Sequence, residues 1–130
     1  IVTTLLSNRD INRTLCVDAE SNNASQLSDG TRVMADSMGR IIEIGKELKD
    51  WQSIDTGVFL MDAEVLYNIK YLMKHNGKRV SISEVVQHMA DTGRHFQVCD
   101  VSGQFWADVD TAEDHDSVSN LLRGGYDYAL

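Results

Sequence analysis

One stretch of this chain decides its fold class: Phe105-Trp106-Ala107-Asp108-Val109-Asp110-Thr111, followed by Ala112-Glu113-Asp114. Its pattern predicts a short buried strand that brings Asp108 and Asp110 to its carboxyl end. Residues two apart on a strand point to the same side, so the two carboxylates would project together. Two carboxylates this close repel each other unless a cation lies between them, and a hard divalent ion such as Mg²⁺ prefers oxygen ligands of this kind. The alternative is that both are solvated side chains at a strand-to-helix junction.

A helix is expected directly after this strand. Thr111 is a good N-cap, and Asp114 three residues later completes an approximate capping box. The helix should run to about Leu122 and end at Gly124. Its apolar spacing predicts that it buries three side chains, Val118, Leu121 and Leu122.

The rest of the sequence alternates between apolar runs typical of strands and stripes typical of helices. Strands are expected at residues 13–18, 31–36, 40–45, 54–61 and 95–101, and helices at residues 1–8, 62–75 and 81–92. Turn residues around Gly39 make residues 31–45 a β-hairpin, whereas residues 19–30 are rich in Ser, Asn and Asp and should form a loop. Interleaved strands and helices predict an α/β fold with one inserted hairpin.

The composition is that of one small soluble domain. The chain has 130 residues, of which 42% are hydrophobic and 25% charged, and its net charge is −8. A general nucleic-acid surface needs a basic field, so this charge argues against nucleic-acid partners. No stretch approaches the ~20 apolar residues of a membrane span. Cys16 and Cys99 are too few and too far apart in sequence for a metal cluster or a disulfide framework, and they suit a reducing cytoplasm.

Four motifs, taken together, resemble a known family. They are Ile44-Gly45-Lys46, Ile54-Asp55-Thr56-Gly57-Val58-Phe59, Ser81-Ile82-Ser83-Glu84-Val85-Val86, and the run from Asp100 to Asp114. In this order they resemble the carboxyl-terminal part of the sugar-phosphate and alcohol-phosphate nucleotidyltransferases, most of all the inositol-phosphate cytidylyltransferases. The resemblance implies a Rossmann-like fold with a mixed sheet. It also implies attack by a phosphate monoester on the α-phosphorus of an NTP, with release of pyrophosphate and with Mg²⁺ neutralising the phosphates.

The resemblance also implies roles for individual residues. Asp108 or Asp110 would be the carboxyl-terminal metal ligand, and Lys46 would contact the acceptor's phosphate. The acceptor-binding strand would consist of Asp55, Thr56 and Gly57, where the missing side chain of the glycine lets the substrate lie on the backbone. Simpler alternatives remain, because Lys46 is also typical of a solvated turn and Asp55 could cap a neighbouring loop.

Two features of that family are not found in these 130 residues. They are the glycine-rich loop with basic residues that holds the NTP, and the first metal-binding aspartate. We therefore interpret residues 1–130 as a single partial domain with the amino-terminal NTP-binding half missing, and we expect it to be inactive alone and to self-associate through exposed core surface. The intact enzyme would transfer a nucleotidyl group, CMP from CTP, to a sugar or alcohol phosphate such as inositol phosphate, a step in phospholipid precursor synthesis. The alternative is a non-catalytic binding or assembly domain with the same fold.

Overall fold

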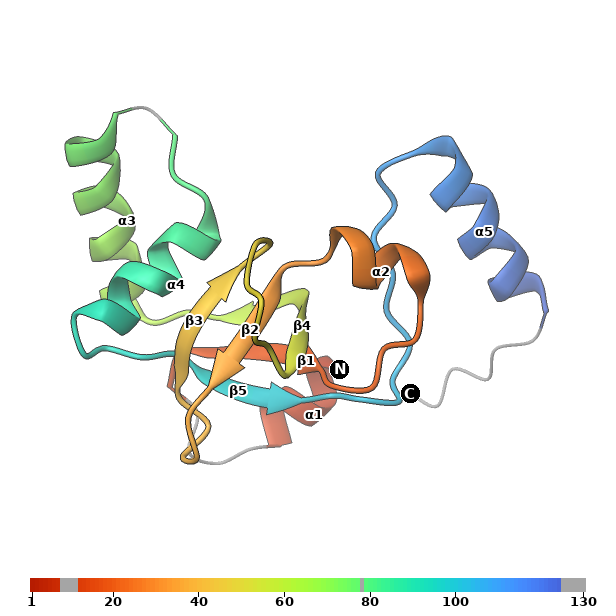
Figure 1. Ribbon diagram of the computed structural model, residues 1–130, viewed down its shortest axis with the longest axis horizontal. Helices are drawn as coiled ribbons and strands as arrows, with labels where there is room; N and C mark the ends of the chain where they lie inside the picture. Colours follow the sequence, from red (N-terminus) through yellow and green to blue (C-terminus); the bar gives the residue numbers. More distant parts are fainter. Residues whose placement is uncertain (8–11, 78, 125–130) are drawn as a thin grey trace.

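A five-stranded mixed sheet is the centre of the computed structural model, which describes residues 1–7, 12–77 and 79–124 (Figure 1). The strand order is β3-β2-β4-β1-β5. The strands are β1 (Thr14–Asp18), β2 (Arg32–Ala35), β3 (Ile41–Gly45), β4 (Ser53–Leu60) and β5 (Gln97–Asp100). The helices are α1 (Val2–Ser7), α2 (Ala24–Asp29), α3 (Ala63–Asn76), α4 (Ile82–Asp91) and α5 (Ala112–Arg123).

The sheet combines one parallel pair with an antiparallel set. β1 and β5 are parallel neighbours, whereas β4 is antiparallel to β1 and to β2. β2 and β3 form the expected hairpin. The turn of this hairpin lies beside β5, because the Val98 N–H donates to the Gly39 carbonyl (2.9 Å) and the Ile41 N–H to the Phe96 carbonyl (2.8 Å). These contacts cover part of the outer edge of β5, and the mixed α/β architecture expected from the sequence is confirmed.

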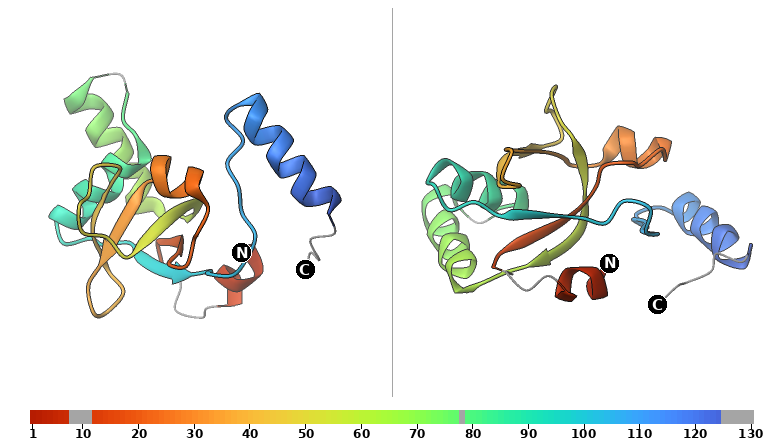
Figure 2. Two further views of the ribbon diagram at one scale, coloured as in Figure 1. Left: turned by 45° about the vertical axis from the view of Figure 1, so that its right-hand side comes forward. Right: turned by 90° about the horizontal axis from the view of Figure 1, so that it is seen from below.

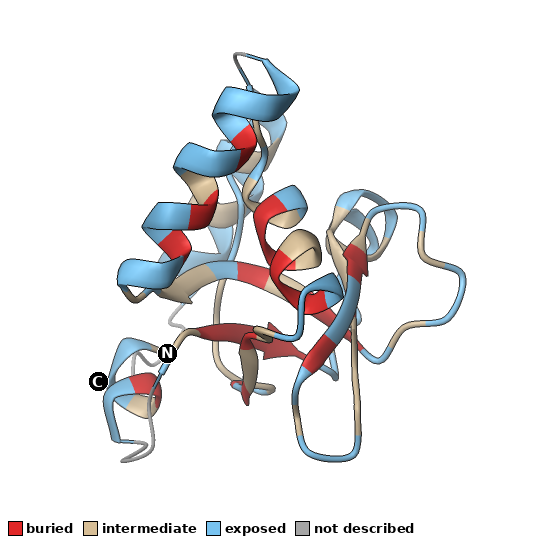
Figure 3. Ribbon diagram, turned by 90° about the vertical axis from the view of Figure 1, so that its left-hand side faces the viewer, coloured by how far each residue is buried: buried red, intermediate tan, exposed pale blue. Residues whose placement is uncertain are grey.

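Helices cover both faces of the sheet, with two longer ones on one face and a short one on the other. α3 and α4 lie together on one side, where they bury the main core, whereas α1 lies on the other side (Figure 2). Buried side chains follow the inner faces of α3 and α4 and the strands beneath them (Figure 3). The largest fully buried members are Phe96, Leu15, Ile41, Ile54 and Met89. Over the described part of the chain, no helix is both long and apolar enough to cross a membrane.

Side-chain caps start the three long helices where the sequence predicts them. The Asp62 carboxylate accepts from the Val65 N–H (3.2 Å) at the start of α3. Complete capping boxes join Ser81 to Glu84 in α4 and Thr111 to Asp114 in α5. Each of these caps satisfies backbone N–H groups that a helix start leaves without a partner.

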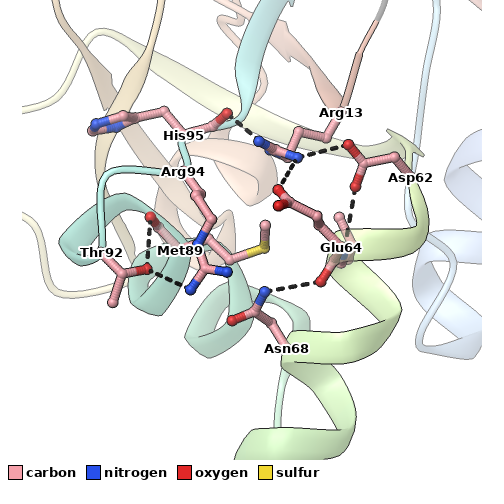
Figure 4. A network of polar contacts seen from close by, with 9 residues as sticks. Arg13, Asp62, Glu64, Asn68, Met89, Thr92, Arg94 and His95 are labelled. Carbon is pink, nitrogen blue, oxygen red and sulfur yellow. Dashed lines mark hydrogen bonds and ion pairs between the residues drawn. The ribbon is translucent and has the colours of Figure 1, made fainter.

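Arg13 fixes the start of α3 against the sheet (Figure 4). It lies just before β1, and its Nη1 donates to Asp62 (2.6 Å) and to Glu64 (2.8 Å) while its Nε donates to the His95 carbonyl (3.3 Å). The Asp62 cap, the first turn of α3 and the approach to β5 are therefore held by one guanidinium group.

One expected loop contains a helix. Residues 24–29 form α2, although the sequence predicted a loop over residues 19–30. The Asn23 side chain caps α2 by accepting from the Ser25 N–H (3.0 Å), and the Gly30 N–H closes the helix on the Gln26 carbonyl (2.9 Å). α2 buries no residue, and its sequence shows no apolar stripe that would predict a helix. The prediction of a loop was wrong because the caps at Asn23 and Gly30 and a bond from Gln26 to Trp106 stabilise this helix.

The acidic stretch is not a strand. Residues 104–110 pair with no strand of the sheet, and Asp108 and Asp110 are exposed. α5 begins at the predicted residue but stands apart from the sheet (Figure 2) and buries none of its side chains. Leu121 and Leu122 are each 42% exposed, so the expectation that they are buried is wrong. No strand of the described sheet pairs with residues 104–110, and an alternating apolar pattern forms a strand only where a neighbouring strand can pair with it.

Candidate functional site

A bulge in β4 presents the predicted acceptor-binding residues. Leu15 pairs with Phe59 and Val17 with Asp55, so three residues of β4 lie opposite Cys16 alone. Gly57 has φ +79°, a conformation that favours glycine, and a Cβ there would meet no atom within 4 Å. The backbone at this bulge is therefore open to an approaching molecule, as the sequence interpretation of Gly57 requires.

Thr56 is turned inward at the same bulge. Its side chain is buried, and its hydroxyl donates to the Cys16 carbonyl over 2.8 Å. The bulge interrupts the ladder at Cys16, so this bond satisfies a carbonyl that would otherwise lose its strand partner. In this geometry Thr56 stabilises the bulge and does not reach outward.

Asp55 has the carboxylate most affected by its surroundings at the bulge. Burial raises its pKa from 3.8 to about 6, the hydrogen bond from the Gly57 N–H opposes that shift, and the nearby Asp108 carboxylate adds to it. The Gly57 N–H lies 2.6 Å from the Asp55 Oδ1. Asp55 is on β4 and Asp108 follows β5, so the fold brings together two carboxylates that are far apart in the sequence.

Lys46 lies in the same part of the sheet. One row of paired residues crosses four strands, from Gly45 through Arg32 and Ile54 to Asp18. Lys46 follows Gly45 on β3, and Asp55 follows Ile54 on β4, a strand that runs in the same direction. β2 lies between β3 and β4, and neighbouring strands are about 5 Å apart, so Lys46 and Asp55 lie about 10 Å from each other across the sheet. Lys46 is exposed, and no salt bridge engages it in the described part of the chain.

Asp108 and Asp110, the acidic pair predicted to bind a metal, have different surroundings. Asp108 lies near Asp55, whereas the Asp110 N–H donates to the Asp114 carboxylate (3.3 Å) at the entrance of α5. The strand geometry that would make them project together is not present. Their role as metal ligands remains a prediction.

The sequence interpretation missed a buried carboxylate, Asp18, at the carboxyl end of β1. Only 6% of this residue is exposed, its Oδ2 accepts from the Trp106 indole N–H (2.8 Å), and its Oδ1 accepts from the Glu20 N–H (2.9 Å). Trp106 is held in turn by Gln26, whose side-chain amide donates to the Trp106 carbonyl (3.0 Å). A carboxylate that ends an otherwise apolar strand was the available signal, since such a group needs a partner.

Asp18 forms part of a polar cleft of about 290 Å³ between α2 and the segment that follows β5. Asp100, at the carboxyl end of β5, accepts from the Ser102 N–H (2.9 Å), and the Ser102 hydroxyl accepts from the Ala19 N–H (2.9 Å). The cleft is lined by Asp18, Glu20, Ser21, Asn22, Asn23, Gln26, Gly103, Gln104, Phe105, Trp106 and Leu121. It lies beyond the carboxyl ends of two parallel strands, where α/β folds commonly bind ligands.

The carboxylates near the bulge fit a Mg²⁺ ion better than a metal that needs a complete protein cage. Across residues 1–7, 12–77 and 79–124, no group of three or more His, Cys, Asp or Glu side chains could hold a metal ion. Mg²⁺ is usually held by one or two carboxylates together with waters and substrate phosphates. Asp108 raises the pKa of Asp55 electrostatically, and a cation bound beside them would relieve that repulsion.

Comparisons of the sequence with known proteins give one consistent set of relatives. No family model matches the chain. It is 36% identical over 83 residues to the "Bifunctional IPC transferase and DIPP synthase" of Thermococcus kodakarensis, and 32% identical over 95 residues to the protein of that name from Aquifex aeolicus. These matches cover 64% and 73% of this chain but 18% and 21% of the relatives, so the chain spans about a fifth of the length of the curated proteins that it matches.

Solved structures give the same result for the fold. The inositol-1-phosphate CTP transferase from T. maritima matches 92% of this chain with a TM-score of 0.70 and 25% identity, over 49% of its own length. CMP:2-keto-3-deoxy-manno-octonic acid synthetase, complexed with CTP, matches 95% of this chain with a TM-score of 0.62 at 16% identity, which shows the fold alone. The nucleotidyltransferase fold expected from the four motifs is confirmed.

Proposed function

We propose that this chain supplies the acceptor-binding side of a nucleotidyltransferase. It resembles that family and, within it, most of all the inositol-phosphate cytidylyltransferases. The reaction would move CMP from CTP to a sugar or alcohol phosphate such as inositol phosphate. An oxygen of the acceptor's phosphate forms a bond to the α-phosphorus of the NTP, and the bond from that phosphorus to pyrophosphate breaks. The observation that carries the proposal is the likeness to the T. maritima transferase in both sequence and fold.

The residues around the β4 bulge would divide this work between them. The Lys46 ammonium would neutralise the acceptor's phosphate, and the Asp55 carboxylate would accept hydrogen bonds from hydroxyl groups of the acceptor. Gly57 would leave space for the acceptor, and Thr56 would hold the bulge in shape.

The metal part of the site would lie beside the acceptor. Mg²⁺, when bound by Asp108 or Asp110, would supply charge neutralisation at the phosphates. The nearness of Asp108 to Asp55 supports this arrangement, since it brings the acidic stretch to the acceptor-binding strand. To serve as a metal ligand, the carboxylate of Asp108 or Asp110 would have to remain ionised.

Binding of inositol 1-phosphate to the 130-residue chain tests the acceptor site. With Mg²⁺ present, we expect Lys46→Ala to weaken binding by about ten- to a hundredfold, because a hydrogen bond to a charged group contributes roughly 1.5–3 kcal/mol. Titration calorimetry or NMR shifts measure the dissociation constant. Lys49→Ala, three residues further along, is the matched control and should leave binding unchanged.

Unphosphorylated inositol separates a phosphate contact from a general effect on the chain. Its binding should be the same for the native chain and for Lys46→Ala, because it carries no phosphate for the ammonium to neutralise. If Lys46→Ala and Lys49→Ala weaken inositol 1-phosphate binding equally, the assignment of Lys46 is wrong.

The exposed face of α5 favours a second candidate function, assembly with other chains. Leu121, which also borders the polar cleft, and Leu122 are each 42% exposed, and Val109, just before the helix, is 51% exposed. We expect the chain to form dimers or larger assemblies that the double change Leu121→Lys, Leu122→Lys reduces to monomers, since apolar contact drives such association. Light scattering over a range of concentrations measures the mass, with Ser117→Lys on the same helix as the control. A monomer at every concentration would contradict this proposal.

A further inference from the structure

The two cysteines of the chain, 83 positions apart in the sequence, are direct partners in the sheet. Cys16 pairs with Cys99 in the parallel ladder between β1 and β5. Both side chains belong to the small apolar cluster that Leu5 of α1 helps to cover. The sequence alone gave no reason to expect a pair here, because the distance in sequence hides the register of the two strands.

The backbone spacing of this pair suits a disulfide. Adjacent strands lie about 4.8 Å apart, and disulfides join residues whose Cα atoms are roughly 4.4–6.8 Å apart. The two side chains share one face of the sheet, so their thiols point toward the same space. Both cysteines are free in this structure.

The two thiols differ in access and in reactivity. Cys16 is 0% exposed, whereas Cys99 is 8% exposed and lies on the outer strand β5. Burial and the neighbouring Cys99 thiol raise the pKa of Cys16 to about 11. Because the thiolate is the attacking form, Cys16 is a poor first nucleophile. α1 has six residues and buries only Leu5, so little packing has to open for a reagent to reach the pair.

We propose that Cys16 and Cys99 form a dithiol site that a small disulfide oxidises to an intramolecular disulfide. Cys99 attacks the small disulfide first, which forms a mixed disulfide at Cys99 and releases one small thiol. The Cys16 sulfur then attacks the Cys99 Sγ, which forms the Cys16–Cys99 bond and releases the second small thiol. The two protein thiols lose two protons and two electrons, and the small disulfide gains them.

The position of this pair gives the modification a structural consequence. β1 continues from Cys16 to Asp18, which lines the polar cleft, and β5 continues from Cys99 to Asp100. The new bond would therefore lie two residues before a residue of the cleft. The Thr56 hydroxyl also donates to the Cys16 carbonyl, which joins the pair to the β4 bulge.

Oxidised glutathione is the probe for this site. The native chain is incubated with it under non-denaturing conditions, quenched with acid and measured by intact mass and by peptide mapping without reductant. We expect a chain that has lost two hydrogens and carries no glutathione, with the peptide that contains Cys16 joined to the peptide that contains Cys99. Cys16→Ala should instead accumulate one glutathione on Cys99, and Cys99→Ala should stay reduced.

Alanine is used because a buried serine hydroxyl would need a new hydrogen-bond partner. Circular dichroism of both variants shows that they fold, and the native chain alone already decides the result if one of them does not. The proposal is overturned if the native chain yields only mixed disulfides, only bonds between chains, or a Cys16–Cys99 bond that forms in urea but not without it.

Discussion

Asp108→Asn or Asp110→Asn, in an enzyme that joins these residues to a nucleotide-binding half, is expected to lower turnover by about a hundredfold or more. Each change would remove a proposed negative ligand while keeping nearly the same shape, so the metal would neutralise less of the phosphate charge while folding changes little. Pyrophosphate release with CTP, Mg²⁺ and inositol 1-phosphate measures turnover. The two changes should not add, because under the proposal both would act through one ion.

Asp116→Asn is the matched control for this pair. Asp116 is an exposed carboxylate on α5, close in sequence to the acidic stretch, and the proposed site does not use it. Should both Asp108→Asn and Asp110→Asn keep the turnover of this control, the metal assignment fails. The two carboxylates would then be features of the entrance to α5, where the Asp110 N–H already donates to Asp114.

The sequence predicted those parts of the fold that depend on neighbouring residues. Helix starts at Asp62, Ser81 and Thr111 were predicted correctly because each cap bonds to a backbone N–H three residues away. The hairpin of β2 and β3 was predicted correctly for the same reason, since its turn residues lie between the two strands. α2 is the exception, because its residues bury nothing that a pattern could reveal.

The features that depend on contacts between distant residues could not be predicted in the same way. The bond between Trp106 and Asp18 joins residues 88 positions apart, and the pairing of Cys16 with Cys99 depends on strand register. The bulge at Gly57 follows from a mismatch between β1 and β4, to which both strands contribute. The resemblance to a family pointed to Asp55 and Gly57, and the structure adds the nearness of Asp55 to Asp108.

Asp55→Asn is expected to stabilise the metal-free chain at pH 7 by about 2–3 kcal/mol, because a pKa difference of one unit corresponds to about 1.36 kcal/mol. Burial raises the pKa of Asp55 from 3.8 to about 6, so the folded chain keeps its proton at pH values where the unfolded chain has lost it. The stability from this group is fully present below pH 3.8 and is lost as the pH rises through 6. Asparagine stays neutral throughout and can still accept from the Gly57 N–H.

Urea unfolding between pH 4 and 8, in the presence of a chelator, measures this effect as the difference in unfolding free energy between the variant and the native chain. The difference should grow as the pH rises from 4 to 6 and then become constant. Asp36→Asn is the control of opposite sign, because hydrogen bonds from Arg40 and Met38 hold the pKa of Asp36 below its usual value. Stability from Asp36 is therefore lost as the pH falls. If the difference for Asp55→Asn does not change with pH, the Asp55 carboxylate is solvated in the folded chain. Its coupling to Asp108 then no longer supports an acceptor site beside the proposed metal.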